Sequence, residues 1–295
     1  MVIAVKASGL CHTDFEVLKA NYGTSAFPVV PGHEYAGVVA DVGPGVTGFA
    51  VGERVVVDPN LECGTCRACL RGWAHLCDSL DAYGVTENGG FAEFSRVKAS
   101  ALHRIGDMDF SIAALCEPMG CVLNGLDAVR SPITDNALIF GAGPMGLLLA
   151  MALSARNVPD IVFTDIDDTR LELAASFGFN FVTSGSSQLA ALHHGVDLVV
   201  DATGVPAVAG NLVNYMANGA RGLFFGVCPS EHPASTRNDR RFRSRYQPPR
   251  VASYASGRCL QYSVVQPAER ELKNTGNDKL IVRFMRWSLA TKSIG

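Results

Sequence analysis

The amino-acid sequence predicts an α/β protein whose second half contains a parallel β-sheet. The chain has 295 residues, of which 48% are hydrophobic and 18% charged, and this composition is typical of a globular protein with room for two domains. Residues 137–155 read as a buried strand, a glycine-rich turn and an apolar helix. Four cysteines within residues 63–77 predict a metal-binding loop in the first half.

Composition argues against a membrane partner and against a nucleic-acid partner. The formal net charge is −3, and residues 1–6 lack the basic and apolar regions of a signal peptide. We therefore expect a cytoplasmic protein in a reducing compartment. The run from Ala137 to Ala155 approaches the length of a membrane span, but its three glycines and one proline favour a strand, a turn and a helix.

The cysteine-rich loop predicts a structural zinc ion. Stable disulfides are disfavoured in a reducing compartment, and a bacterial ferredoxin-type cluster needs a shorter last gap followed by proline. Cys-x-x-Cys turns can direct thiolates at one zinc ion about 2.3 Å away, and four sulfurs leave no position for a substrate. The expected ligands of this site are Cys63, Cys66, Cys69 and Cys77.

A second set of possible metal ligands is scattered along the chain. Cys11 precedes Thr13 by two residues, His33 is followed by Glu34, and Cys116 is followed by Glu117 and Pro118. None of these groups is convincing alone, because a lone buried cysteine is more often packing and a lone His-Glu pair is more often at the surface.

The second half carries the pattern of a dinucleotide-binding unit. The turn that follows the strand at 137–140 lets the backbone approach a pyrophosphate, which the helix amino terminus attracts. Its residues are Gly141, Gly143, Pro144, Met145 and Gly146. A second strand ends at Asp165, nineteen residues beyond Gly146, where a carboxylate binds ribose hydroxyls and favours NAD over NADP. The alternative is that Asp165 only begins a turn. Strands at 196–200 and 222–227 continue the sheet.

Taken together, these motifs resemble the zinc-dependent medium-chain dehydrogenases. The run Gly32-His33-Glu34-Tyr-Ala-Gly37 fits the family signature, and Glu117-Pro118 is similar to the sorbitol and polyol dehydrogenase branch. The resemblance extends from about residue 2 to about residue 227. It implies a GroES-like zinc-binding catalytic domain over 1–111, a Rossmann NAD-binding domain over 112–229 and an active site in the cleft between them.

The resemblance also implies the roles of individual residues. The catalytic zinc would be held by Cys11, His33 and Glu117, directly or through water, while Glu34 supports the site or replaces a ligand. Thr13 would accept the proton of the alcohol and pass it outward, Asp14 would orient ligands, and Arg170 would lie near the adenosine. Two alternatives remain open: Cys116 as the third ligand instead of Glu117, and Glu16 as a proton relay or a surface charge.

The expected function is hydride transfer between a secondary alcohol or polyol and NAD. A zinc-free quinone reductase is disfavoured, because such proteins need neither the ligand set nor the four-cysteine loop. The resemblance implies a homo-oligomer, but the two ends of this chain differ from those of the family, so the oligomeric state stays open. The alternative is a non-catalytic remnant that binds zinc and dinucleotide.

The remnant hypothesis comes from the two ends of the chain. Relatives carry an additional hairpin before the segment where this sequence starts. Residues 237–295 contain thirteen Lys and Arg against four Asp and Glu, whereas the preceding residues contain twelve against twenty-four. We interpret 230–295 as an atypical, poorly ordered tail, in preference to a basic nucleic-acid arm. We expect the sheet to stop after its fifth strand, with Cys259–Val265 as the one plausible replacement strand.

Overall fold

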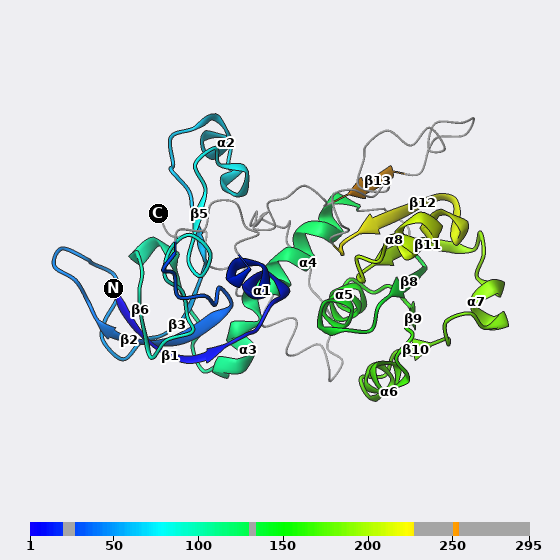
Figure 1. Cartoon of the computed structure of the whole chain (residues 1–295), viewed down its shortest axis with the longest axis horizontal. Helices are drawn as coiled ribbons and strands as arrows, with labels where there is room; N and C mark the ends of the chain where they lie inside the picture. The colour runs from blue at the N-terminus through cyan, green and yellow to red at the C-terminus, as the bar shows by residue number, and fades with distance from the viewer. Residues whose placement is uncertain (20–26, 130–133, 227–249, 254–295) are drawn as a thin grey trace. The chain divides into compact units, whose positions relative to one another are not determined.

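The chain folds into two compact units, shown in a computed structural model that describes residues 1–19, 27–129, 134–226 and 250–253 (Figure 1). The first unit contains Met1–Cys121 and the second begins at Val122. The division falls within helix α4 (Cys116–Ala128). No loop or change in composition marks this point in the sequence, which predicts a boundary near residue 111. Within the described residues, no helix is both long and apolar enough to cross a bilayer.

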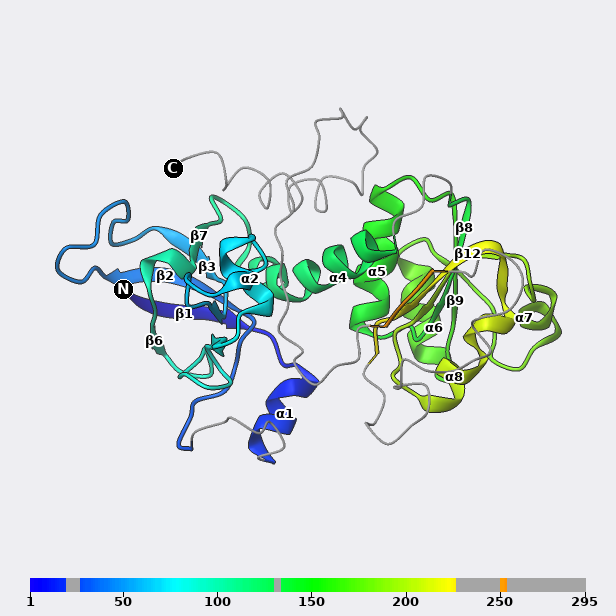
Figure 2. The same ribbon diagram turned by 90° about the horizontal axis from the view of Figure 1, so that it is seen from above.

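A five-stranded antiparallel sheet forms the core of the first unit, as expected for a GroES-like β domain. The strand order is β6-β1-β2-β3-β7, and Figure 2 shows β1, β2 and β3 side by side. The strands are β1 (Val2–Ser8), β2 (Tyr35–Asp41), β3 (Arg54–Val57), β6 (Phe94–Arg96) and β7 (Leu102–Arg104). Buried side chains such as Ile3, Tyr35 and Val55 fill one face, and the Tyr35 hydroxyl meets Ser95 Oγ at 2.9 Å.

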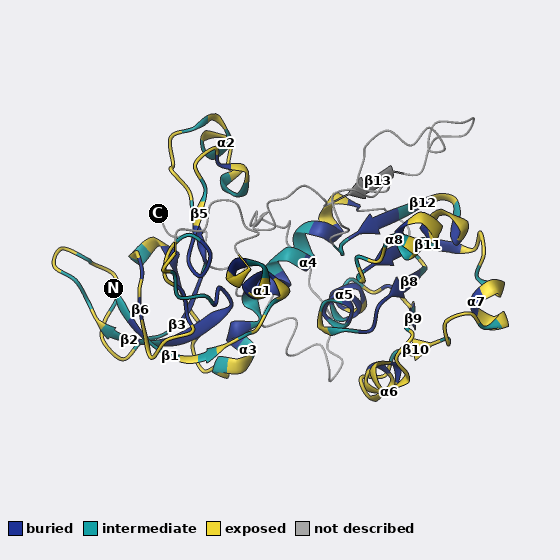
Figure 3. Cartoon of the chain, viewed as in Figure 1, coloured by how far each residue is buried: buried dark blue, intermediate teal, exposed yellow. Residues whose placement is uncertain are grey.

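Short elements surround this sheet and carry the polar residues of interest. They are α1 (His12–Leu18), β4 (Asn60–Leu61), α2 (Arg67–Leu70), the 3₁₀ turn Ala74–Leu76, β5 (Asp81–Ala82), the 3₁₀ turn Ala99–Ala101 and α3 (Phe110–Ala114). The antiparallel pair β4 and β5 forms the base of the cysteine-rich loop. Figure 3 shows that this loop is largely exposed, whereas β2 and β3 are buried.

The second unit is a parallel sheet with the order β10-β9-β8-β11-β12-β13. Its elements are β8 (Asn136–Phe140), α5 (Pro144–Ala155), β9 (Asp160–Thr164), α6 (Asp168–Ser176), β10 (Asn180–Phe181), α7 (Ser187–Ala191), β11 (Val196–Asp201), α8 (Pro206–Asn211), the 3₁₀ turn Leu212–Asn214, β12 (Met216–Phe224) and β13 (Arg250–Ser253). Helix α5 packs on β8 and β9, and α6 packs on β9 and β10 (Figures 1 and 2). The predicted strand, turn and helix over 137–155 are confirmed as β8 and α5.

The sequence predicts a sheet that stops after its fifth strand, but the structure has a sixth strand, β13. Strand β13 pairs in parallel with β12 over four positions, from Arg221 with Arg250 to Phe224 with Ser253. The pairing satisfies backbone groups along an edge of β12 that would otherwise be exposed. The four residues of β13 are too few to show strand periodicity in the sequence. The expected replacement strand, Cys259–Val265, and the rest of the tail lie outside the described residues.

Candidate metal centres and cofactor-binding edge

The four cysteines of the 63–77 loop converge on one point. Their sulfur atoms all lie within 4.8 Å of one another. The Sγ atoms of Cys66 and Cys69 are 3.4 Å apart, and those of Cys63 and Cys69 are 3.9 Å apart. Four thiolates from one loop can fill the tetrahedral coordination sphere of zinc, so the donor set fits a closed structural site.

Backbone N–H groups stabilise negative charge on two of these sulfurs. Cys66 N donates to Cys63 Sγ at 3.3 Å, and Cys63 N donates to Cys77 Sγ at 3.3 Å. Hydrogen bonds from Thr65, by its backbone and its hydroxyl, and from the backbone of Cys66 lower the pKa of Cys63 to about 6. Because the thiolate is the form that binds a metal, these donors prepare the loop for zinc.

A second metal cluster is formed by Cys11, His33 and Glu34. One donor atom of each lies within 4.8 Å of the donors of the other two, although Cys11 is far from the other two in sequence. Cys11 is the residue before α1, and His33 and Glu34 directly precede β2. Cys11 is half-buried, whereas His33 and Glu34 are buried. Three donors of this kind leave one position open in a tetrahedral zinc site, so the set fits a catalytic ion.

The carboxylate of Asp14 holds this cluster together. It accepts hydrogen bonds from Cys11 N at 2.8 Å and from Gly32 N at 3.1 Å. Its Oδ1 also lies 3.2 Å from Nδ1 of His33, although that contact lacks the direction of a good hydrogen bond. Burial would raise the pKa of Asp14, but His33 and the two backbone donors outweigh it and hold the pKa below its usual value.

The negative charges around His33 favour a cation at this place. Burial alone would lower the pKa of His33, but Asp14, Cys11 and Glu117 together raise it to about 11. With Nδ1 next to Asp14, the other ring nitrogen, Nε2, lies 4.0 Å from Oε1 of Glu34. The surroundings that favour a proton on the ring also favour a divalent metal. A carboxylate beside the ring nitrogen that does not bind the metal, as Asp14 lies beside Nδ1, is a common support for a histidine ligand.

Glu117 is close to the cluster without being one of its three donors. It lies buried in the first turn of α4, and its charge contributes to the raised pKa of His33. Its role as a zinc ligand stays a prediction, because the carboxylate grouped with Cys11 and His33 is that of Glu34. Cys116 packs against a hydrophobic cluster that includes Ala36 and Val56, and burial raises the pKa of its thiol. This location favours Glu117 over Cys116.

Thr13 and Glu16, both on α1, have different surroundings. The Thr13 hydroxyl is buried and lies 3.7 Å from Cys11 Sγ, so it adjoins the metal cluster. Glu16 Oε1 lies 2.9 Å from Lys19 Nζ and 3.5 Å from His12 Nε2. Glu16 therefore belongs to a surface charge network with His12 and Lys19.

The carboxyl edge of the parallel sheet provides a place for a dinucleotide. The chain runs from β8 to β9 on one side and later returns to β11 on the other side of β8, so the strand order reverses there. Ligands of such sheets bind outside the strand ends at this reversal. Gly141 has a φ of +100°, and a Cβ atom on Gly146 would collide with Gly141 O. Both glycines are therefore required for the tight turn between β8 and α5.

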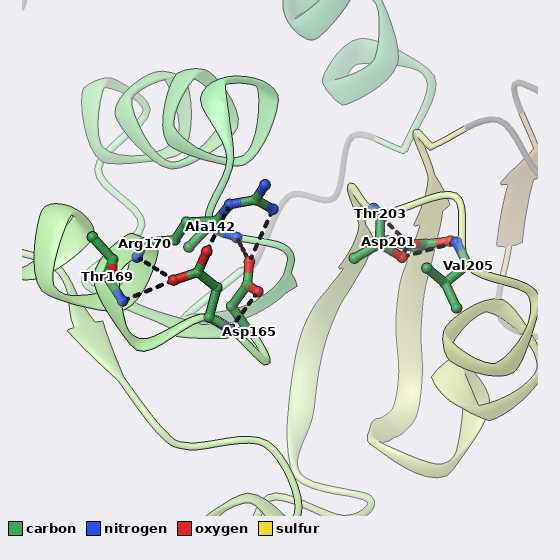
Figure 4. Close-up of polar contacts among 8 residues, drawn as sticks. Ala142, Asp165, Thr169, Arg170, Asp201, Thr203 and Val205 are labelled. Atoms are coloured by element: carbon green, nitrogen blue, oxygen red, sulfur yellow. Dashed lines mark hydrogen bonds and ion pairs between the residues drawn. The ribbon is translucent and has the colours of Figure 1, made fainter. Parts of the chain in front are cut away.

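Asp165 lies next to this turn, as Figure 4 shows. Its Oδ2 accepts a hydrogen bond from Ala142 N at 2.8 Å, and its Oδ1 accepts one from Asp167 N at 3.0 Å. Arg170 Nη1 is 4.0 Å from Asp165 Oδ2, and Arg170 Nε is 3.6 Å from Asp167 Oδ2. The structure thus joins three predicted elements, the glycine turn, Asp165 and Arg170, at one edge.

A second loop at this edge was not singled out from the sequence. Asp201 ends β11, and its Oδ1 accepts hydrogen bonds from Thr203 N at 2.8 Å, Thr203 Oγ1 at 2.6 Å and Gly204 N at 3.2 Å (Figure 4). Two apolar side chains at the same edge are exposed: Ile166, directly after Asp165, with an exposed fraction of 93%, and Val205. The signal in the sequence is the Asp-Ala-Thr-Gly stretch, residues 201–204, at the end of a buried strand.

Comparisons with known proteins agree with this geometry. The model of the alcohol dehydrogenase GroES-like domain matches residues 1–107, and that of the zinc-binding dehydrogenases matches residues 144–247. The chain is 52% identical over 231 residues to D-altritol 5-dehydrogenase of Agrobacterium fabrum, covering 77% of this chain and 69% of that protein. It is 33% identical over 237 residues to D-arabinitol dehydrogenase 1 of Uromyces fabae, covering 77% and 68%.

A solved structure is similar in the same way. A protein of Sinorhizobium meliloti 1021, named as a zinc-binding dehydrogenase and solved bound to NADP, superposes with a TM-score of 0.74 at 30% identity. The match covers 79% of this chain and 70% of that one.

The two clusters should differ in their effect on folding. Cys66→Ser should remove one zinc ion and lower Tm by about 10 °C, because a closed thiolate site contributes directly to folding. Cys11→Ser should remove the other zinc ion with little change in Tm. Zinc per chain, measured by elemental analysis, and thermal unfolding check this. Cys121→Ser, which changes a cysteine outside both clusters, is the control. Equal loss of stability in the Cys66 and Cys11 variants would contradict the division.

Glu117 and Cys116 can be separated by matched variants. Glu117→Gln should weaken zinc binding at the second cluster about tenfold or more, because it removes a buried charge close to a ligand. Cys116→Ser should leave zinc affinity near that of the parent, since the thiol packs among apolar side chains. Competition with a chromogenic chelator measures both affinities. A neutral Glu117→Gln together with a severe Cys116→Ser would show that the thiol is the ligand.

Proposed function

The chain belongs to the family of zinc-binding alcohol dehydrogenases, and we propose that it oxidises a secondary hydroxyl group of a polyol with NAD. The observation that carries this proposal is the cluster of Cys11, His33 and Glu34, which combines the donors of a zinc site with an open position. The carboxyl edge of the parallel sheet supplies a separate place for the dinucleotide.

The residues divide between two proposed zinc sites. Cys11 and His33, with a carboxylate from Glu34 or Glu117, would hold a catalytic ion, and the four cysteines of the 63–77 loop would hold a structural one. A bound zinc ion lowers the pKa of a hydroxyl group, so that an alkoxide can exist near neutral pH. Asp14 keeps the His33 ring in place, and the Thr13 hydroxyl, next to Cys11, would relay the alcohol proton outward by accepting it and giving up its own.

The substrate class follows from the relatives and from one motif. D-altritol 5-dehydrogenase and D-arabinitol dehydrogenase 1 are named for polyols. Glu117-Pro118 at the start of α4 is similar to the polyol dehydrogenase branch, and its buried carboxylate adds negative charge near His33. The alternative of a non-catalytic remnant rested partly on an unfinished sheet, and the pairing of β13 with β12 removes that reason.

The preference for NAD over NADP is also part of the proposal. The Asp165 side chain is 6% exposed, and hydrogen bonds from the backbone N–H groups of Ala142 and Asp167 fix its carboxylate at the end of β9. A fixed carboxylate accepts hydrogen bonds from ribose hydroxyls and repels a 2′-phosphate. Arg170 pairs with Asp165 and Asp167, so its charge is already engaged. The NADP in the Sinorhizobium structure shows that a relative with a similar fold binds the other cofactor.

The function is tested by following NAD reduction at 340 nm with zinc-loaded protein. D-altritol, D-arabinitol, sorbitol and xylitol are the substrates, and ethanol is the control. We expect kcat/KM for at least one polyol to exceed that for ethanol about tenfold or more, because a site that hydrogen-bonds several hydroxyls discriminates against a substrate lacking them. Zinc-loaded protein that binds NAD and oxidises none of the polyols would contradict the proposal.

The cofactor preference is tested at Asp165. Asp165→Asn keeps the shape of the side chain but removes its charge, so kcat/KM for NAD should fall about tenfold while kcat/KM for NADP rises. Asp167→Asn is the matched control: it removes a charge from the cap of α6 and should leave the ratio of the two efficiencies near that of the parent. A ratio unchanged in Asp165→Asn would mean that another residue sets the preference.

A further inference from the structure

Gly9 lies directly against the carboxylate of Glu34. It follows the last residue of β1, and its N–H donates to Glu34 O at 2.7 Å. A Cβ atom built on Gly9 would be 3.1 Å from Glu34 Cβ and 3.2 Å from Glu34 Cδ. It would also lie closer to Glu34 Oε2 than the 3.0 Å that real Cβ atoms keep. The side chain of Glu34 therefore fills the space that any side chain at position 9 would need.

Space, and not backbone conformation, requires glycine at this position. The φ of Gly9 does not fall in the left-handed region, where L residues are strained. Gly32, in contrast, has a φ of +92° and needs glycine for that reason as well. At Gly9 an alanine is compatible with the backbone, and the collision with Glu34 is the obstacle.

The carboxylate end of Glu34 could avoid such a collision only by leaving its place beside Cys11 and His33. It is buried, and the next residue, Tyr35, begins β2 and is completely buried. Its Oε1 lies 4.0 Å from Nε2 of His33, and one of its oxygens lies within 4.8 Å of the Cys11 and His33 donors. A carboxylate held there without a cation would be costly, because a buried charge needs a partner.

We propose that Gly9 is a positioning residue for metal binding: it lacks a side chain so that the Glu34 carboxylate can lie beside Cys11 and His33. Gly9 thereby fixes the third donor of the cluster. The inference rests on the proposed function, because it assumes that this cluster binds zinc.

The test compares Gly9→Ala with a matched control. Gly43→Ala adds the same methyl group in the same unit, where nothing lies within 4 Å and φ is not left-handed. We expect Gly9→Ala to weaken zinc at the second cluster about tenfold or more, as changes to groups that support metal ligands do, and Gly43→Ala to leave the affinity unchanged. Chelator competition measures affinity, and the visible absorption of cobalt-substituted protein reports the geometry of the site.

A double-mutant cycle shows whether Gly9 acts through Glu34. In Glu34→Ala protein the carboxylate is gone, so adding Gly9→Ala should cause no further loss of zinc affinity. If Gly9→Ala alone does not fold, the double variant should fold and match Glu34→Ala, because alanine at position 34 removes the severe collision with Oε2 and leaves only the milder 3.1 Å approach to Cβ. An undiminished effect of Gly9→Ala in the Glu34→Ala background, or a double variant that does not fold, would overturn the inference.

The outcomes also separate this inference from the proposed function. Parent protein that binds zinc only at the four-cysteine loop would refute the catalytic zinc site and this inference with it. Parent protein with two zinc ions, and a Gly9→Ala variant of equal affinity and equal cobalt spectrum, would refute the role of Gly9 alone.

Discussion

The carboxylate of Asp14 is the contact on which the rest of the cluster of Cys11, His33 and Glu34 depends. It lies on α1 but is 1% exposed, and it accepts hydrogen bonds from Cys11 N and Gly32 N while facing the His33 ring. Two segments that are distant in the sequence thus meet at one acceptor. Because burial of an ionised carboxylate is costly without partners, these contacts stabilise the folded arrangement and fix the positions of Cys11 and His33. The geometry of the donors is set by protein contacts, which is what a site with one open position requires.

The two metal clusters differ in what holds them. The four cysteines belong to one exposed loop closed by the short pair β4 and β5, and little apolar surface supports it. Such a loop takes its shape from the ion, so metal binding and local folding are coupled. The second cluster is anchored at the end of β1, the start of α1 and the start of β2, beside a buried core. A rigid support of this kind suits an ion that exchanges ligands, because the donors remain in place when one position changes.

The sequence predicted those features that are local. The spacing of the cysteines, the glycine turn and Asp165 were all visible, because each depends on a few neighbouring residues. The grouping of Glu34 with Cys11 and His33 was expected only from the resemblance, because no local pattern brings these segments together. The chain bends at Gly32, three residues before β2, and both His33 and Glu34 reach the same place. The hydrogen bonds of the Asp201 turn and the strand β13 also escaped prediction. The turn matters because of which strands lie beside β11, and β13 is recognisable only by its pairing with β12.

Close backbone packing completes the support of His33. Gly90 N donates to Gly32 O at 2.7 Å, while Gly32 N donates to Asp14, so both backbone polar groups of Gly32, the residue before His33, are engaged. A Cβ atom on Gly89 would collide with Gly32 O, and one on Gly84 would crowd the same peptide. The glycines of the 84–90 segment therefore allow one stretch of backbone to lie directly on another. Together with Gly9 against Glu34, they show that the position of the metal donors depends as much on where side chains are missing as on the donors themselves.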